Sequence, residues 1–129
     1  NIMDQTVLLK KLDEAGIDTQ KAIGRFMGNT ALFLKFVRRL PDALRFGEIR
    51  TALQQEDDET FYMLVHTLKG TAANLSAENL AECVQAILVE YRASSFKHMR
   101  KLEGLLREAE VESENLSELL RQMDADLSD

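Results

Sequence analysis

Apolar residues recur every three or four positions along most of the chain, which is the spacing of an amphipathic α-helix. The run over 96–123 predicts one long C-terminal helix, which we expect to be loosest near 110–115. Two shorter runs predict helices over 58–75 and 77–92, with Ser76 as the N-cap of the second. The residues expected to face inward on this second helix are Leu80, Cys83, Val84, Ile87 and Tyr91.

The first half of the chain carries a weaker helical pattern. A helix over 30–54 should be kinked or briefly broken at Pro41, because proline lacks a backbone donor and clashes with the preceding turn. Two short helices should precede it, over 2–13 and over 18–27, the first of them ended by Gly16. The residues predicted to face inward are Val7, Leu8 and Leu12 on the first helix and Leu32, Phe33, Phe36, Val37, Leu40, Leu44, Ile49 and Leu53 on the kinked one. The expected N-caps are Asp18 or Thr19, Asn29 or Thr30, and Asp57 or Asp58.

Four amphipathic helices joined by short polar turns predict an all-α fold. The simplest arrangement is an antiparallel up-down-up-down four-helix bundle, here with short extra N-terminal helices. One proline and six glycines are too little turn material for a protein of many strands. We expect a single domain over 1–129, with the core bundle at about 29–125 and an N-terminal helical entry segment over 1–28.

Composition excludes several classes of function. The net charge of −6 argues against binding of a nucleic-acid backbone, which requires basic patches. Cys83 is the only cysteine, and we expect it to be a small buried apolar residue rather than part of a disulfide or a metal cluster. No apolar run reaches the roughly 20 residues of a membrane span, and no signal peptide is apparent. These features indicate a cytoplasmic protein without membrane contact or a bound metal.

The chemically distinctive stretch lies in the third of the four predicted helices. There Phe61, Leu64, Leu68 and Leu75 share the apolar face, whereas His66 points away from it. Lys69 and Gly70 lie one turn beyond His66 on the polar face, and Ala73 lies about two turns beyond. Glycine inside a helix costs about 1 kcal/mol relative to alanine, and Gly70 is not on the core-facing stripe. Its small size therefore indicates close approach by another molecule.

The stretch His66-Thr67-Leu68-Lys69-Gly70-Thr71-Ala72-Ala73-Asn74-Leu75, followed by Ala77 and Leu80, closely resembles the signature of histidine-containing phosphotransfer (HPt) domains. An upstream block is similar to their entry segment and first bundle helix: Ile17-Asp18, Ala22 to Asn29, and Leu32-Phe33. The resemblance covers about residues 17–125. Ser76 and Ala73 stand where family members often have glycine, and both substitutes are small.

The resemblance implies a phosphocarrier of a two-component phosphorelay, with His66 as the phosphoacceptor through Nε2 and Lys69 as stabiliser of the phosphoryl group. Gly70 and Ala73 would let response-regulator receiver domains dock against the helix. Tyr62 and Met63 would either join this docking surface or only line a groove at the margin of the core. The chain would need no cofactor, because the receiver supplies Mg²⁺, and no ATP site is apparent. We expect a monomer. It is either free-standing or part of a hybrid sensor kinase, and the absence of an initiator methionine favours the second.

Other functions remain as alternatives. A non-catalytic helical adaptor or dimerisation bundle would explain the four helices but not the combination of His66, Lys69 and Gly70 on one face. The phosphoacceptor domain of chemotaxis-type kinases also carries a histidine on a bundle, although the block Arg25 to Phe33 resembles the other type more. A di-metal site would need inward Glu-x-x-His motifs, which the sequence lacks, and no nucleophilic-serine or phosphate-loop motif is present. His98 is expected to be a solvated residue on the last helix.

Overall fold

The computed structural model describes residues 4–128 of the chain, and in this part it is all-helical apart from an isolated bridge between Ile17 and Ala77. The predicted all-α fold is therefore confirmed. The helices are α1 (Gln5–Glu14), α2 (Thr19–Arg25), α3 (Thr30–Val37), α4 (Leu40–Ala43), α5 (Phe46–Gln54), α6 (Asp58–Asn74), α7 (Glu78–Ser94) and α8 (Met99–Ser128).

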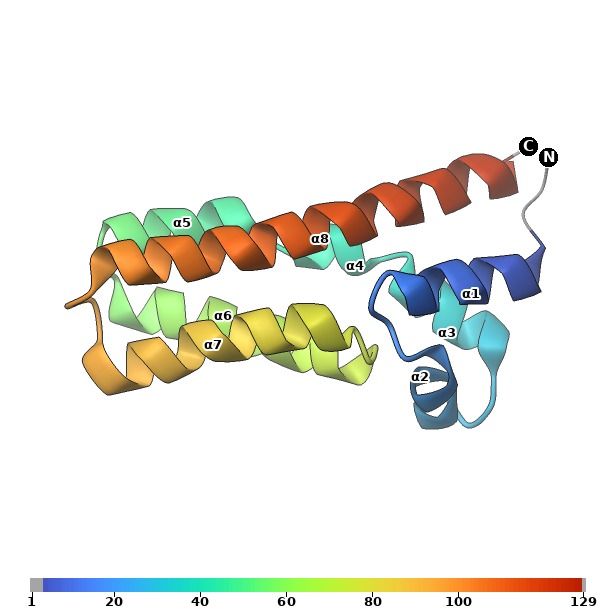
Figure 1. The fold of residues 1–129 in the computed structure, drawn as a ribbon, viewed down its shortest axis with the longest axis horizontal. Coiled ribbons are helices and arrows are strands. Elements are labelled where there is room, and N and C mark those ends of the chain that lie inside the picture. The colour runs from blue at the N-terminus through green and yellow to red at the C-terminus, as the bar shows by residue number, and fades with distance from the viewer. Residues whose placement is uncertain (1–3, 129) are drawn as a thin grey trace.

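The main body is a bundle of α5, α6, α7 and α8, which run back and forth along the long axis of the molecule (Figure 1). Because the connections between these helices are short, consecutive helices are antiparallel neighbours. Helix α8 extends past the bundle, and α1 packs against this extension while α2 and α3 complete the same end (Figure 1). The residues predicted to be loose, 110–115, are regular helix within α8, where Ser113 is buried.

The core consists of apolar side chains from every helix, and most of the predicted inward positions are buried. Val7 is an exception at 45% exposure, because it lies on the outer side of α1 from the buried Leu8 and Leu12. Leu32 and Phe36 are also more than a third exposed, and Cys83 is only half-buried. The buried core includes Phe33, Val37, Leu40, Leu44, Ile49, Leu53, Phe61, Leu64, Val65, Leu68, Ala72, Leu75, Leu80, Val84, Ile87, Leu102, Leu106, Leu116 and Leu120.

The predicted kink or short break at Pro41 is confirmed as a break, but the chain breaks on both sides of the proline rather than once. Helix α3 ends at Val37, and Pro41 lies in the first turn of α4, where its missing N–H would be unpaired in any case. A second break follows at Arg45, whose φ of 51° is left-handed. The first bundle helix is thus divided into three segments.

Three of the predicted caps are confirmed, since the side chains of Asp18, Asn29 and Asp57 accept hydrogen bonds from backbone N–H groups of the first turns of α2, α3 and α6. The predicted cap Ser76 is wrong. Helix α7 begins one residue later than expected, and its N-cap position, Ala77, makes no side-chain hydrogen bond. Ser76 instead adopts a left-handed φ of 52°, and its hydroxyl accepts a hydrogen bond from Arg25.

The entry segment is tied to the turn between α6 and α7. Asp18 N–H donates to the Ser76 carbonyl at 2.9 Å, and Glu78 N–H donates to the Gly16 carbonyl at 2.9 Å. Gly16 has a φ of 98°, a conformation that glycine adopts without steric penalty, and it ends α1 as predicted. Helix α2 ends at Arg25, two residues before the predicted end, and residues 2–3 of the first predicted helix lie outside the described residues.

Candidate functional site

His66 lies near the middle of α6 with its side chain exposed, and the buried Phe61, Leu64, Leu68 and Ala72 occupy the opposite side of the helix. This is the orientation predicted from the helical pattern. Of its predicted neighbours, Gly70 and Ala73 are exposed and Lys69 is half-buried. Tyr62 and Met63, one turn before His66, are 37% and 53% exposed. The structure therefore places all six candidate residues on a single helix, His66, Lys69, Gly70, Ala73, Tyr62 and Met63.

The imidazole of His66 is stacked on the ring of Tyr62. The two ring centroids are 5.5 Å apart and the ring planes differ by only 7°. Side chains four residues apart are neighbours on a helix, and each side chain leans toward the N-terminus, so the His66 ring lies over the preceding turn that carries Tyr62. The histidine thus has an aromatic partner on one face.

A residue that the sequence did not point to also contacts Tyr62. The guanidinium of Arg92, from the end of α7, lies 5.9 Å from the centre of the Tyr62 ring. Its Nη2 also donates to the Tyr62 hydroxyl at 3.3 Å. Residues 62 and 92 are nearly equally distant in sequence from the turn at Ser76, so an antiparallel α6–α7 pair brings them together. This equal spacing about the turn is the feature of the sequence from which the contact between Tyr62 and Arg92 could have been predicted.

One turn beyond His66, the surface carries the charge of Lys69 and the missing side chain of Gly70. No acidic side chain of the described residues lies within ion-pair distance of the Lys69 ammonium, so its charge is not neutralised by the protein itself. A Cβ at Gly70 would meet no atom within 4 Å. Internal packing therefore does not require glycine at this position.

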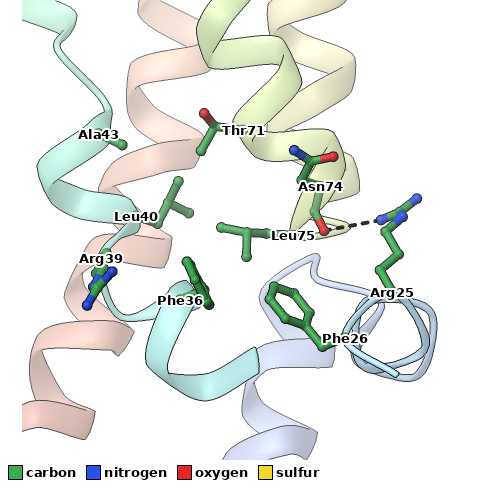
Figure 2. A pocket seen from close by; sticks show the side chains of 9 residues that line it. All are labelled: Arg25, Phe26, Phe36, Arg39, Leu40, Ala43, Thr71, Asn74 and Leu75. Atoms are coloured by element: carbon green, nitrogen blue, oxygen red, sulfur yellow. Dashed lines mark hydrogen bonds between the residues drawn. The ribbon is translucent and has the colours of Figure 1, made fainter. Parts of the chain in front are cut away.

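An apolar groove that the sequence analysis missed borders the C-terminal end of α6 (Figure 2). Its volume is about 430 Å³. The rings of Phe26 and Phe36, with centroids 5.4 Å apart, lie on one side of it, and Thr71 and Asn74 of α6 lie on the other. Asn74 lies one helical turn beyond Gly70, so the groove continues the exposed face that carries His66.

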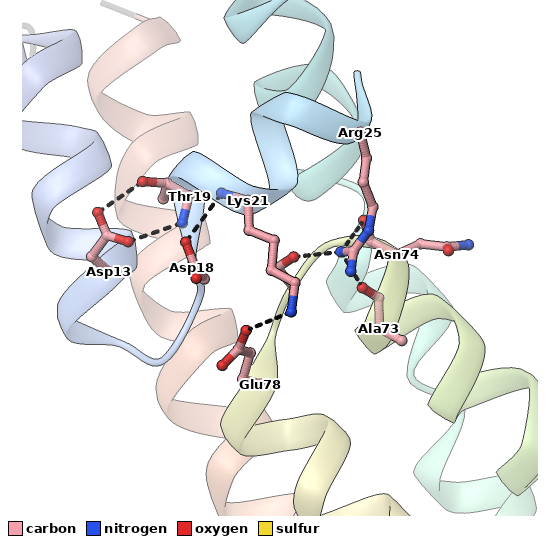
Figure 3. A network of polar contacts seen from close by, with 9 residues as sticks. Asp13, Asp18, Thr19, Lys21, Arg25, Ala73, Asn74 and Glu78 are labelled. Carbon is pink, nitrogen blue, oxygen red and sulfur yellow. Dashed lines mark hydrogen bonds and ion pairs between the residues drawn. The ribbon is translucent and has the colours of Figure 1, made fainter. Parts of the chain in front are cut away.

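Arg25 joins α2 to the last turn of the helix that carries His66 (Figure 3). Its Nη1 donates to the carbonyls of Ala73 and Asn74 at 2.6 and 3.4 Å and to the Ser76 hydroxyl. A helix leaves its last four carbonyls without intrahelical partners, and an arginine is a suitable donor to them. Nearby, Lys21 pairs with Glu78 at 3.5 Å.

His98, the other histidine, has a different environment. Its Nδ1 lies 3.1 Å from the carboxylate of Glu90, whose side chain is only 7% exposed and also accepts from Lys101 at 2.9 Å. His98 is therefore solvated, as predicted, but it is also tied to α7. Among the described residues, no group of three His, Cys, Asp or Glu side chains is close enough to hold a metal ion.

The model of the Hpt domain family matches residues 32–126, which is most of the chain. The chain belongs to this family. Hpt domains are phosphocarriers of two-component phosphorelays rather than catalytic enzymes, and they interact with receiver domains and kinases. The match begins in α3 and includes His66, while α1 and α2 lie outside it.

Searches of curated proteins and of solved structures found no match. Within residues 4–128, no helix combines the length and the apolar composition needed to cross a membrane.

Proposed function

We propose that this Hpt domain relays a phosphoryl group between receiver-domain aspartates through His66. The observation that carries the proposal is the exposed imidazole in the middle of α6, inside the family match and beside an unpaired ammonium. The other histidine, His98, is also exposed, but its Nδ1 is tied to the buried carboxylate of Glu90 near the C-terminal end of α7. His66 makes no ion pair with a carboxylate of the described residues, so its ring is available to a partner.

The chemistry follows from the imidazole. A neutral ring nitrogen, which we take to be Nε2, attacks the phosphorus of the receiver's aspartyl phosphate, so that an N–P bond forms and the P–O bond to the carboxylate breaks. The second transfer reverses these roles with another receiver. Lys69 supplies a point charge to the phosphoryl oxygens during both transfers. The receiver supplies Mg²⁺, so this chain contributes no cofactor, and it does not phosphorylate itself from ATP.

The docking surface begins at the small residues beyond His66. Gly70 and Ala73 let the rim of the receiver active site approach the backbone of α6, while the exposed Tyr62 and Met63 supply apolar contact on the other side of the histidine. We further infer that the domain works as a monomer in the cytoplasm, since one receiver at a time fits over a single histidine.

The test is phosphotransfer from a set of phosphorylated receiver domains to the wild type, to His66→Gln and to His98→Gln. We expect an acid-labile, base-stable label on the wild type and on His98→Gln, and none on His66→Gln. Label on His66→Gln would show that another residue is the acceptor. No label on any variant, while an established carrier is labelled alongside, would favour the alternative of a non-catalytic adaptor.

Lys69 is tested separately, because its role is electrostatic. Lys69→Ala should slow transfer or shorten the lifetime of the phosphohistidine without changing the urea midpoint of unfolding. Lys97→Ala, which removes an exposed lysine at the α7–α8 turn, is the charge-matched control. If the two variants have the same transfer rate and the same phosphohistidine lifetime, Lys69 does not stabilise the phosphoryl group.

A further inference from the structure

We propose that Tyr62 is a positioning residue for phosphotransfer: its ring holds the imidazole of His66 in one orientation. Arg92 in turn holds the Tyr62 ring in place. The proposal rests on His66 being the phosphoacceptor. It assigns a role to two residues, one on α6 and one on α7, that act through the histidine rather than on the phosphoryl group.

The first step is the stack itself. An exposed histidine on a helix is free to rotate about both side-chain torsions, and ordering such a side chain costs entropy during each transfer. The nearly parallel rings of Tyr62 and His66, 5.5 Å apart, restrict this rotation before the receiver arrives. Transfer requires the attacking nitrogen in line with the bond that breaks, so a pre-oriented ring has a lower barrier.

The second step is that Tyr62 is itself fixed, although it is not a core residue. At 37% exposure its ring is not held by burial alone. Arg92 contacts it twice, with the guanidinium over the ring face and a hydrogen bond to the hydroxyl. The Tyr91 ring packs on it as well, with centroids 6.2 Å apart.

The third step connects this arrangement to the core. The Tyr91 ring lies 5.2 Å from the ring of the fully buried Phe61 and 5.4 Å from that of Phe96. Its hydroxyl donates to Asp58 in the first turn of α6. A continuous series of aromatic contacts thus runs from the interior through Tyr91 and Tyr62 to His66. A residue that served only to cover the core margin would not need this support on its solvent side.

The experiment compares Tyr62→Leu, which removes the ring, with Tyr62→Phe, which keeps it. We expect Tyr62→Leu to lower the maximal rate of transfer from a phosphorylated receiver by about tenfold. The half-saturating receiver concentration should change little, because leucine keeps an apolar side chain for contact with the receiver. Tyr62→Phe should restore most of the rate, because the stack needs the ring. Val111→Ala, at an exposed apolar position of α8, should transfer at the wild-type rate.

Arg92→Gln should lower the maximal rate by a smaller factor, of about threefold, because Tyr91 still supports the Tyr62 ring. Arg107→Gln, at an exposed arginine of α8, is the charge-matched control and should have no effect on the rate.

Two further measurements do not depend on a receiver. The NMR signals of the His66 ring protons should move on Tyr62→Leu, through loss of the tyrosine ring current, and stay nearly in place in Tyr62→Phe. Labelling of His66 by phosphoramidate, a small phosphodonor that needs no docking, should slow in Tyr62→Leu. A change confined to the half-saturating receiver concentration would make Tyr62 a docking residue and overturn the proposal, as would a wild-type rate in Tyr62→Leu. Failure of every receiver to label the wild type would instead overturn the proposed function, and this inference with it.

Discussion

The guanidinium of Arg25 donates a hydrogen bond of 2.6 Å to the backbone carbonyl of Ala73, across 48 residues of sequence. Ala73 is in the last turn of α6, two helical turns beyond His66. The entry segment therefore supports the helix that carries the histidine, at a carbonyl whose other donors are backbone N–H groups of the turn after α6.

Arg25→Ala should lower the free energy of unfolding by about 1 to 2 kcal/mol, because it removes charged hydrogen bonds to Ala73 and to the Ser76 hydroxyl. The measurement is equilibrium unfolding in urea. Lys21 is on the same helix as Arg25 and forms an exposed ion pair with Glu78 of α7. Lys21→Ala should therefore change the free energy of unfolding by less than about 0.5 kcal/mol. Equal losses in the two variants would contradict the role given to Arg25.

Ser76 has an unfavourable left-handed backbone conformation, but its hydroxyl accepts a hydrogen bond from Arg25. Ser76→Ala should destabilise the fold by about 1 kcal/mol, because it removes the acceptor for Arg25 and keeps a side chain at a φ of 52°. Ser76→Gly also loses the acceptor, but it relieves a left-handed conformation that costs non-glycine residues about 1 kcal/mol. We expect Ser76→Gly to unfold at a higher urea concentration than Ser76→Ala. The opposite order would show that the backbone is not strained there.

Gly70 should be a position where stability and function conflict. Gly70→Ala and Gly104→Ala both place a methyl group in open space inside a helix, so each should raise the free energy of unfolding by about 0.5 to 1 kcal/mol. Only Gly70→Ala should also slow phosphotransfer, and Gly70→Glu should block it while leaving the helical circular dichroism spectrum unchanged. Normal transfer by Gly70→Glu would rule out the close approach of a receiver at this position.

Glu90 should make the stability of the bundle depend on pH. The hydrogen bond from Lys101 holds the pKa of this carboxyl below its usual 4.5, against the opposing effect of burial and with a further contribution from His98. A pKa that is lower in the folded state stabilises the fold above the unfolded-state pKa, and this stability is lost as the pH falls through the folded-state value. The difference in unfolding free energy between the wild type and Glu90→Gln should therefore be largest near neutral pH and shrink below the ordinary glutamate pKa.

Urea titrations of both proteins at several pH values measure this difference. Lys101→Met should reduce the same pH dependence, because it removes the partner with the largest effect on Glu90. Lys97→Met, an exposed neighbour at the same turn, serves as the control. A difference between wild type and Glu90→Gln that stays constant down to the acid transition would contradict the pairing.

The helical pattern was a reliable guide wherever one face of a helix meets the core. Phe61, Leu64 and Leu68 are buried and His66 is exposed because a period of 3.6 residues places them on opposite sides of α6. The pattern failed where a local choice depends on a distant residue. Ser76 looked like an N-cap by residue type, but hydrogen bonds with Arg25 and Asp18 hold it in a left-handed turn instead.

The sequence by itself determined the all-α fold, the exposed histidine, and the lysine and glycine one turn beyond it, since each of these depends on residues close together in the chain. Only the tertiary structure decided that Arg92 lies against Tyr62 and that Phe26 and Phe36 form a groove beside α6. These relationships join helices that are distant in sequence. Their geometry depends on how the helices pack, which the periodicity of a single helix does not specify.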